Sequence, residues 1–211
     1  MATTTPNYGW TVPTSTDLVK DGATAIETLG DAIDASMNTA LGTKKAGMVL
    51  LNTTSFSAVS SQSVNDVFSA TYTNYFILLD MDASDADAGV NMRMRVSGAD
   101  NSSSNYRWSN GYAVTDGAAS VSAQNGSGLT TVFRVAAISS VSRNFAKFDL
   151  FNPFTAEETG FLGQFFQKYG ANSTTHFSGG IMSVTTSYTG FTLIPTAGTI
   201  TGTVSVYGYN K

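Results

Sequence analysis

The sequence predicts a mainly β protein with one N-terminal helix. We expect an extended arm over residues 1–16, a single α-helix within residues 17–45 that forms a short coiled-coil neck, and an antiparallel β-sandwich or jelly-roll domain over residues 46–211. After residue 46, short runs of β-branched and aromatic residues alternate with clusters rich in Gly, Asn, Ser and Asp. Helical periodicity is confined to residues 17–41, so an alternating α/β fold is not expected.

The arm of residues 1–16 is expected to be extended and to dock on another surface. It contains two prolines and several threonines and lacks the apolar pattern of a core element. Tyr8, Trp10 and Val12 nevertheless place large apolar side chains at alternate positions. Such an arm buries its rings either on a partner or back on its own chain, and the sequence leaves both alternatives open.

The helix prediction rests on start signals, a heptad pattern and glycines at the end. The Thr, Ser and Asp residues at positions 14–17 offer side-chain oxygens for an N-cap, and Gly42 and Gly47 end the segment. Heptad spacing places the small residues Gly22 and Ser36 on the same stripe as the apolar ones. The predicted oligomer seam consists of Val19, Ile26, Leu29, Ile33 and Ala40.

This helix needs a partner, because helices in proteins are stabilised mainly by the packing of their apolar face. One alternative is further copies of the same chain, wound as a short coiled coil. The other is the chain's own β-domain. If the helix self-associates, the isoleucines of the seam argue against a dimer.

The strands of the β-domain are predicted from short apolar runs and from alternation. Val90, Met92, Met94 and Val96 fall on one face of a strand, and the polar residues between them fall on the other. We expect about eight to ten strands, a number and spacing that favour a sandwich or jelly roll. The clearest predicted strands are residues 48–51, 75–83, 90–96, 131–138, 146–150, 161–169 and 199–209.

Composition excludes several classes of partner. Charged residues make up 12% of the chain, against about 25% in an average soluble protein. The net charge is −4, so nothing attracts a nucleic-acid backbone, and the absence of cysteine excludes disulfides and thiolate metal sites. No apolar window is long enough for membrane insertion. The N-terminal segment lacks the pattern of a secretory signal, which favours a virion component made in the host cytoplasm and released by lysis.

The residues that could carry catalysis form no recognisable constellation. His176, the only histidine, lies in a polar stretch that reads as a surface turn, and no serine motif accompanies it. Glu157 and Glu158 are adjacent and point in different directions on a strand, which suits glycoside hydrolysis poorly. We therefore expect no enzymatic activity and no cofactor.

An acidic run, "DMDASDADAG", leaves one metal question open. Hard cations such as calcium bind several oxygens of one loop, but the spacing here does not match an EF-hand. The alternative is a solvated acidic turn. The residues concerned are Asp80, Asp82, Asp85 and Asp87.

The aromatic segment "NYRWSNGYA" suggests a ligand contact. Tyr106, Trp108 and Tyr112 lie at even spacing and would share a face of an extended strand, with an Asn110–Gly111 turn between them. Aromatic rings beside Asn and Arg are suited to stacking on a sugar while polar groups hold its hydroxyls. The alternative is that these rings belong to an ordinary core.

Residues 5–34, "TPNYGWTVPTSTDLVKDGATAIETLGDAID", resemble the N-terminal segment of bacteriophage tail fibres and related virion appendage proteins. The resemblance lies in N-Y-G-W-x-x-P from Asn7, T-D-x-V-x-D-G from Thr16, and A-I-x-x-L-G-x-A-I from Ala25. Later segments, "VNMRMRVSG" and "FTLIPTAGTITGTVSVYGYNK" among them, look like the β-sandwich modules that end such fibres.

The resemblance implies a homotrimeric virion protein. Its arm would dock on other virion proteins through Tyr8, Trp10 and Pro13, its helix would form the neck, and its head would contact a host surface glycan. Tail fibres are often much longer, so attachment to tail or to capsid stays open. The alternatives are a capsid decoration or adaptor protein without a host ligand, and a carbohydrate-binding module or depolymerase.

Overall fold

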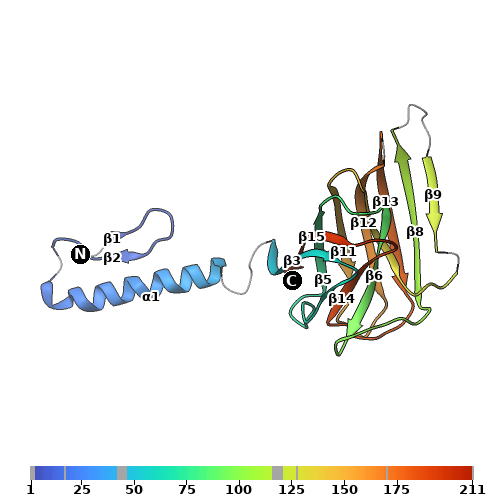
Figure 1. The fold of residues 1–211 in the computed structure, drawn as a ribbon. Coiled ribbons are helices and arrows are strands. Elements are labelled where there is room, and N and C mark those ends of the chain that lie inside the picture. Colours follow the sequence, from blue (N-terminus) through green and yellow to red (C-terminus); the bar gives the residue numbers. More distant parts are fainter. Residues whose placement is uncertain are drawn as a thin grey trace. The chain divides into compact units, whose positions relative to one another are not determined.

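The computed structural model describes residues 3–16, 18–41, 47–115, 121–126, 128–169 and 171–210. The chain divides into two compact units, Met1–Gly47 and Met48–Lys211 (Figure 1). Within the predicted neck of residues 17–45, residues 17 and 42–45 lie outside the described residues. Within the described part of the chain, no helix has the length and apolar character needed to cross a membrane.

The predicted arm is a short hairpin. β1 (Thr3–Thr4) pairs antiparallel with β2 (Thr11–Val12). The backbone N–H of Thr5 donates to the carbonyl of Trp10 at 2.9 Å, which continues the pairing toward the turn. Gly9 has a φ of 68°, a left-handed conformation that glycine adopts without steric cost. The expectation of an extended arm is corrected here, because a glycine turn folds the segment back on itself.

The helix begins later than the sequence predicts. A single 3₁₀ turn, η1 (Val19–Asp21), precedes α1 (Gly22–Leu41), whose 20 residues span about 30 Å. The N-cap of η1 is Leu18, which makes no side-chain capping bond. The expected caps at positions 14–16 therefore precede the helical turns and do not cap them.

The hairpin packs on one side of α1. β2 contacts α1, and the indole Nε1 of Trp10 donates to the Ser36 hydroxyl at 2.9 Å. Within this unit the rings of Tyr8 and Trp10 stack, with centroids 5.1 Å apart. The helix residues half-buried on this side are Gly22, Ala25, Leu29, Ala32 and Ser36.

The second unit consists of antiparallel strands in two sheets. The eight-stranded sheet has the order β3 (Met48–Val59), β15 (Ile200–Tyr209), β5 (Asn74–Met81), β11 (Asn144–Phe151), β12 (Thr159–Tyr169), β13 (Asn172–Met182), β8 (Tyr106–Val114) and β9 (Val121–Asn125). The five-stranded sheet has the order β10 (Phe133–Ile138), β6 (Ala88–Val96), β14 (Gly190–Pro195) and β4 (Gln62–Val64), with β7 (Ala99–Asp100) paired to β6.

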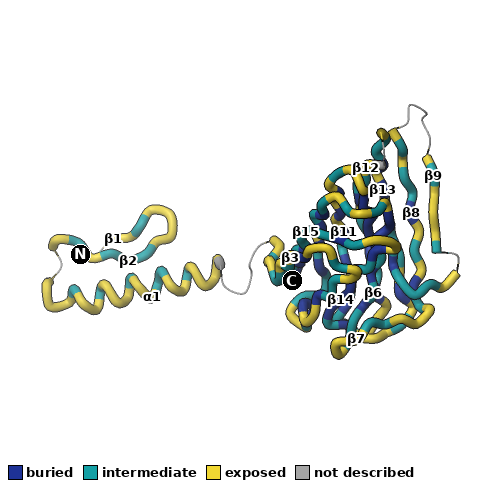
Figure 2. Tube along the Cα trace, viewed as in Figure 1, coloured by how far each residue is buried: buried dark blue, intermediate teal, exposed yellow. Residues whose placement is uncertain are grey.

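One hydrophobic core, made by both sheets, fills the space between them. Figure 2 shows the buried residues concentrated within this unit. On β6 the predicted alternation is confirmed, because Val90, Met92 and Met94 are fully buried while Arg93 and Arg95 are less so. The side chains of β5 alternate in the same way. This alternation places every second residue of each strand between the sheets, where the cavity described below also lies.

The mainly β, antiparallel fold with one N-terminal helix is confirmed. Each of the seven clearest predicted strands corresponds to a strand of the structure: β3, β5, β6, β10, β11, β12 and β15. β13 was expected to begin in a turn, yet it lies in the interior of the eight-stranded sheet between β12 and β8. The short β4, β7 and β9 and the six-residue β14 were not predicted either.

Candidate functional site

A mostly exposed stripe with heptad spacing runs along the helix beside the side that the hairpin covers; within it Ile33 is half-buried. Val19 is 97% exposed and Ile26 is 65% exposed, although both are apolar. Of the predicted seam, Leu29 instead lies on the half-buried hairpin side, so the free stripe is rotated from the predicted one. The residues of this helix stripe are Val19, Ala23, Ile26, Gly30, Ile33, Met37 and Ala40.

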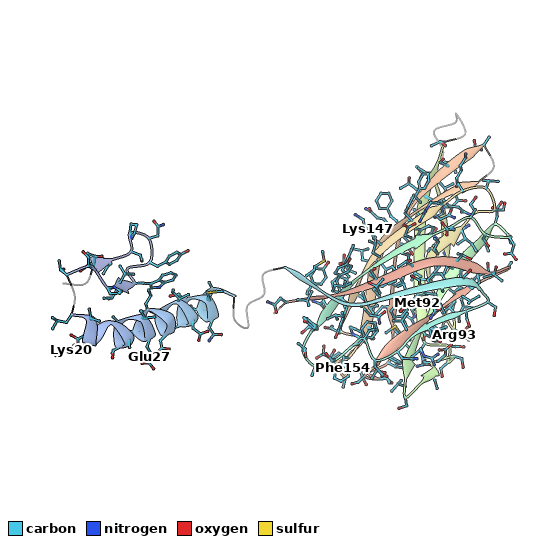
Figure 3. The ribbon with its side chains drawn as sticks, turned by 60° about the vertical axis from the view of Figure 1, so that its left-hand side comes forward. Lys20, Glu27, Met92, Arg93, Lys147 and Phe154 are labelled. Atoms are coloured by element: carbon cyan, nitrogen blue, oxygen red, sulfur yellow. The ribbon has the colours of Figure 1, made fainter. Side chains whose placement is uncertain are left out.

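The face of the eight-stranded sheet that points away from the core is also apolar. Phe145 lies opposite Phe166, and Lys147 lies opposite Leu78 (Figure 3 labels Lys147). The large side chains are exposed, Leu162 by 61% and Phe177 by 59%. Lys147, Asp149 and Gln164 lie between these side chains, but several exposed phenylalanines and leucines on one sheet face are still typical of an interaction site. We call it the outer apolar face; it consists of Phe76, Leu78, Phe145, Leu162, Phe166 and Phe177.

A polar cavity of about 280 Å³ lies between the two sheets, at the border of the hydrophobic core to which its lining residue Phe165 belongs. β8, β12 and β13 of the larger sheet contribute Asn110, Phe165, Gln167 and His176. β6 and β10 of the smaller sheet contribute Ala88, Gly89, Arg134 and Ala137. The exposed residues Asp87, Gln124 and Thr196 complete the lining, so the cavity opens to solvent on their side.

Buried polar atoms without partners line this cavity. Asn110 is 4% exposed, and neither its Oδ1 nor its Nδ2 makes a hydrogen bond within the described part of the chain. His176 is 6% exposed, and its Nδ1 likewise has no partner among these residues. Buried polar groups in proteins are nearly always paired, so two such residues at one cavity require an explanation.

Arg134 brings a positive charge to the same cavity. Its Nε donates to Oδ1 of Asn91 at 3.0 Å, and its guanidinium carbon lies 5.6 Å from the centre of the Trp108 ring. No carboxylate within the described residues lies at ion-pair distance from it. Burial lowers the pKa of Arg134, because removal from water disfavours the charged guanidinium. Asp87 lines the exposed side of the same cavity but is not within ion-pair distance of this guanidinium.

The imidazole of His176 is held neutral. Its ring stacks between Phe165 and Tyr112, at centroid distances of 4.1 and 4.8 Å. Burial and, to a smaller extent, the nearby charge of Arg134 together lower its pKa to about 4. Nε2 lies 3.0 Å from the hydroxyl of Thr174, whose proton goes to the carbonyl of Gln167 at 3.3 Å. Nε2 is therefore the donor in this contact, and Nδ1 remains an unpaired acceptor.

The predicted aromatic site is only partly compatible with the structure. Tyr106, Trp108 and Tyr112 do share the inward face of β8, but Asn110 and Gly111 continue the strand and make no turn. Tyr106 is fully buried, and its hydroxyl donates to the carbonyl of Asn101 at 2.8 Å and accepts from the N–H of Met94 at 3.0 Å. Tyr106 is thus a core residue, and the prediction that it contacts a ligand is wrong.

Trp108 and Tyr112 lie beside the cavity, where each contacts one residue of its lining. Trp108 is half-buried under Arg134, and its Nε1 has no partner among the described residues. Tyr112 is half-buried against His176. Both support residues that line the cavity, although neither belongs to the lining itself.

The acidic run is divided among separate partners. Oδ1 of Asp80 accepts from Arg143 at 2.9 Å, and Asp82 lies 3.5 Å from the same guanidinium. Asp85 accepts from the backbone N–H of Thr199 at 2.8 Å. The carboxylate of Asp87 accepts from the N–H of Ser140 at 2.6 Å. No group of three or more potential ligands that could hold a metal ion is found in the described part of the chain.

The residues predicted for virion docking differ in exposure. Tyr8 is 73% exposed and Pro13 is exposed, so both are free to contact another protein. Trp10 is half-buried because it bonds to Ser36 of the helix. Within the first unit, Trp10 therefore fixes the hairpin and Tyr8 presents its ring.

Sequence reasoning missed the cavity because its residues look ordinary in sequence. His176 was expected in a surface turn, whereas β13 carries it into the space between the sheets. Arg134 lies in a predicted strand, but only the fold shows that it lacks a carboxylate. The one available signal was the alternation of Thr174, His176 and Ser178, three polar residues at the even spacing of one strand face.

No family model matches the sequence, and the searches of curated proteins and of solved structures found no match. The resemblance of residues 5–34 to tail fibres therefore remains a prediction. The function has to be argued from the helix stripe, the outer apolar face and the polar cavity.

Proposed function

We propose that this chain is a structural protein of a bacteriophage virion: a short trimeric tail fibre without enzymatic activity. In this proposal the N-terminal hairpin docks on other virion proteins, α1 forms a coiled-coil neck, and the second unit is a β-sandwich head that contacts a glycan of the host surface. The observation that carries the proposal is the helix stripe: Val19, Ile26 and Met37 stay exposed and Ile33 half-exposed after the hairpin has covered the adjoining side of α1.

The helix stripe has the features of a self-complementary seam. Its residues follow the three–four spacing of a heptad, and they are apolar or small throughout. The side of the helix opposite the hairpin carries Glu27, Asp31, Asp34 and Asn38, all exposed and polar, so the stripe lies between this polar side and the hairpin. Because identical helices present identical stripes, further copies of this chain are the partner that the pattern fits best.

The outer apolar face supports the same assembly from the second unit. A monomer rarely leaves several adjacent phenylalanine and leucine side chains exposed on one sheet. A second copy of the chain presents the same face, so this face is a second candidate surface for self-association. Trimerisation also suits adhesion, since several weak sites on one particle bind with an avidity above that of a single site.

The proposal is tested by measuring the molar mass of the full chain by light scattering at micromolar concentration. We expect three times the mass of the 22.2 kDa chain. The double variant Ile26→Gln/Ile33→Gln should dissociate, because glutamine keeps helix propensity while it removes the apolar stripe. The matched control is Glu27→Gln/Asn38→Gln, which places the same residue on the polar side and should remain trimeric. A monomeric wild-type chain would overturn the proposal.

A further inference from the structure

We propose that the polar cavity between the sheets binds an acidic monosaccharide, with its carboxylate at Arg134 and its hydroxyls at Asn110 and His176. This inference deepens the proposed function: that the sugar comes from a host glycan rests on the fibre proposal. The binding itself depends only on the second unit.

The first step is the charge. Arg134 is partly buried, makes one side-chain hydrogen bond through Nε, and has no carboxylate partner among the described residues. Arg95 and Arg143 of this unit form ion pairs, with Asp100 and Asp80. Arg93 and the exposed Arg107 have no ion pair among the described residues either, but neither lines the cavity. A carboxylate is the planar anion that matches the remaining N–H groups of a guanidinium in a two-pronged arrangement.

The second step is the neutral polar atoms. The Asn110 amide offers one acceptor and two donors, and Nδ1 of His176 offers an acceptor, all without partners in the described structure. A sugar hydroxyl both donates and accepts, so it satisfies either kind of atom. Both residues are more than nine-tenths buried and line the cavity, so they face the ligand and not bulk water.

The third step is size and access. Pockets for small molecules commonly begin near 300 Å³, and this cavity of about 280 Å³ therefore suits one sugar ring. Phe165 supplies an apolar wall, while Gln124 and Thr196 at the exposed side offer further polar contacts. The remainder of a glycan chain would leave through that side.

Gly89 shows how closely the guanidinium is positioned. A Cβ added at Gly89 would collide with the guanidinium group of Arg134. Gly89→Ala should therefore displace the charge without removing it, and sugar affinity should fall although the net charge is unchanged.

The test is calorimetric titration of the full chain with glucuronic acid and N-acetylneuraminic acid, with glucose as the neutral comparator. We expect at least one acidic sugar to bind about tenfold or more tightly than glucose, because a hydrogen-bonded charge is recognised more strongly than a neutral group. Arg134→Gln should reduce that affinity about tenfold or more. Arg107→Gln, on the outward side of the same β8 that carries Asn110, is the matched control and should not change it.

Three outcomes would overturn the inference: no binding of either acid, equal binding of glucose, or equal losses in the two arginine variants. Light scattering on the same samples separates this result from the fibre proposal. A trimer that binds no acidic sugar overturns the inference and leaves the fibre standing. A monomer that binds one through Arg134 supports the inference and counts against the fibre.

Discussion

The space between the two sheets is filled in two different ways along its length. At one end, Phe133 packs against Tyr106 and Phe161 with ring centroids 4.8 and 4.7 Å apart. The Tyr106 hydroxyl there has both a donor and an acceptor partner, and one buried side-chain atom nearby, Oγ1 of Thr159 on β12, has none among the described residues. At the other end, Asn110 and His176 are as deeply buried but leave polar atoms unpaired around a cavity.

The two ends share their strands, so the difference lies in individual side chains. We call the end around Tyr106, Phe133 and Phe161 the dry end. β8 carries Tyr106 to the dry end and Asn110 to the cavity, at positions four residues apart on the same inward face. An unpaired buried polar group lowers the free energy of unfolding by about 1–3 kcal/mol. At the cavity end this loss applies to both Asn110 and His176. Residues that weaken folding in this way are expected where a ligand completes the pairing.

The largest expected effect comes from opening the dry end. Phe133→Ala should lower the free energy of unfolding by about 3–5 kcal/mol, because it removes a fully buried ring and leaves a void. Urea denaturation followed by Trp108 fluorescence, in a Trp10→Phe background, reports on the second unit. A loss below about 1 kcal/mol would show that this end is not tightly packed.

The second effect is a loss of stability at low pH that originates at the cavity end, in His176. The pKa of His176 in the folded state is about 4, below its ordinary value of 6.5, so the unfolded chain binds the proton first. Stability should therefore fall as the pH falls from 6.5 to 4, by roughly 3 kcal/mol at 1.36 kcal/mol per pKa unit, and should not fall further from this group below pH 4.

The control for this pH dependence is His176→Phe, which keeps a ring between Phe165 and Tyr112 but cannot bind a proton. As the pH falls from 6.5 to 4, wild type should lose stability relative to the variant. Outside that window the difference in stability between the two proteins should stay constant. Parallel pH profiles for the two proteins would contradict the assignment, since every other titratable group is common to both.

The third effect tests whether pairing matters at the dry end. Tyr106→Phe should cost about 1–3 kcal/mol, because the N–H of Met94 and the carbonyl of Asn101 lose a buried partner. Tyr112→Phe is the matched control, since the Tyr112 hydroxyl makes no hydrogen bond within the described part of the chain, and it should cost less than about 0.5 kcal/mol. Equal losses measured by urea denaturation would remove the distinction between the ends.

The dry end was largely accessible from sequence, and the cavity end was not. Strands such as β6 and β5 were predicted because their inward positions are apolar, which is the same property that makes them core strands. β13 was missed because its inward positions Thr174, His176 and Ser178 are polar, and polar residues beside glycines read as a turn. The cavity forms where the inward residues of a strand are polar. The alternation of apolar and polar residues that identifies a strand was therefore weakest at the candidate site.

The helix shows a different limit of the sequence. The heptad pattern identified the stripe, but it could not show which part of it the hairpin covers. Trp10 bonds to Ser36, which turns the Leu29 side of the helix toward the arm and leaves Ala23, Gly30 and Met37 beside the predicted isoleucines. That contact joins residues far apart in the sequence, and no local pattern announces it.

The smallest expected change in stability is also the sharpest test of the difference between the two ends. Arg134→Met should alter the free energy of unfolding by no more than about 1 kcal/mol. The substitution removes a cation that is costly to keep out of water, and this gain offsets the lost contact with Trp108 and the lost bond to Asn91. Arg95→Met is the matched control: Arg95 bonds to Asp100, Thr192 and Asn65, so its removal leaves paired groups without partners and should cost about 1–3 kcal/mol. If urea denaturation gave the larger loss for Arg134, its charge would be serving the fold, and the reason to expect an anionic ligand beside it would be gone.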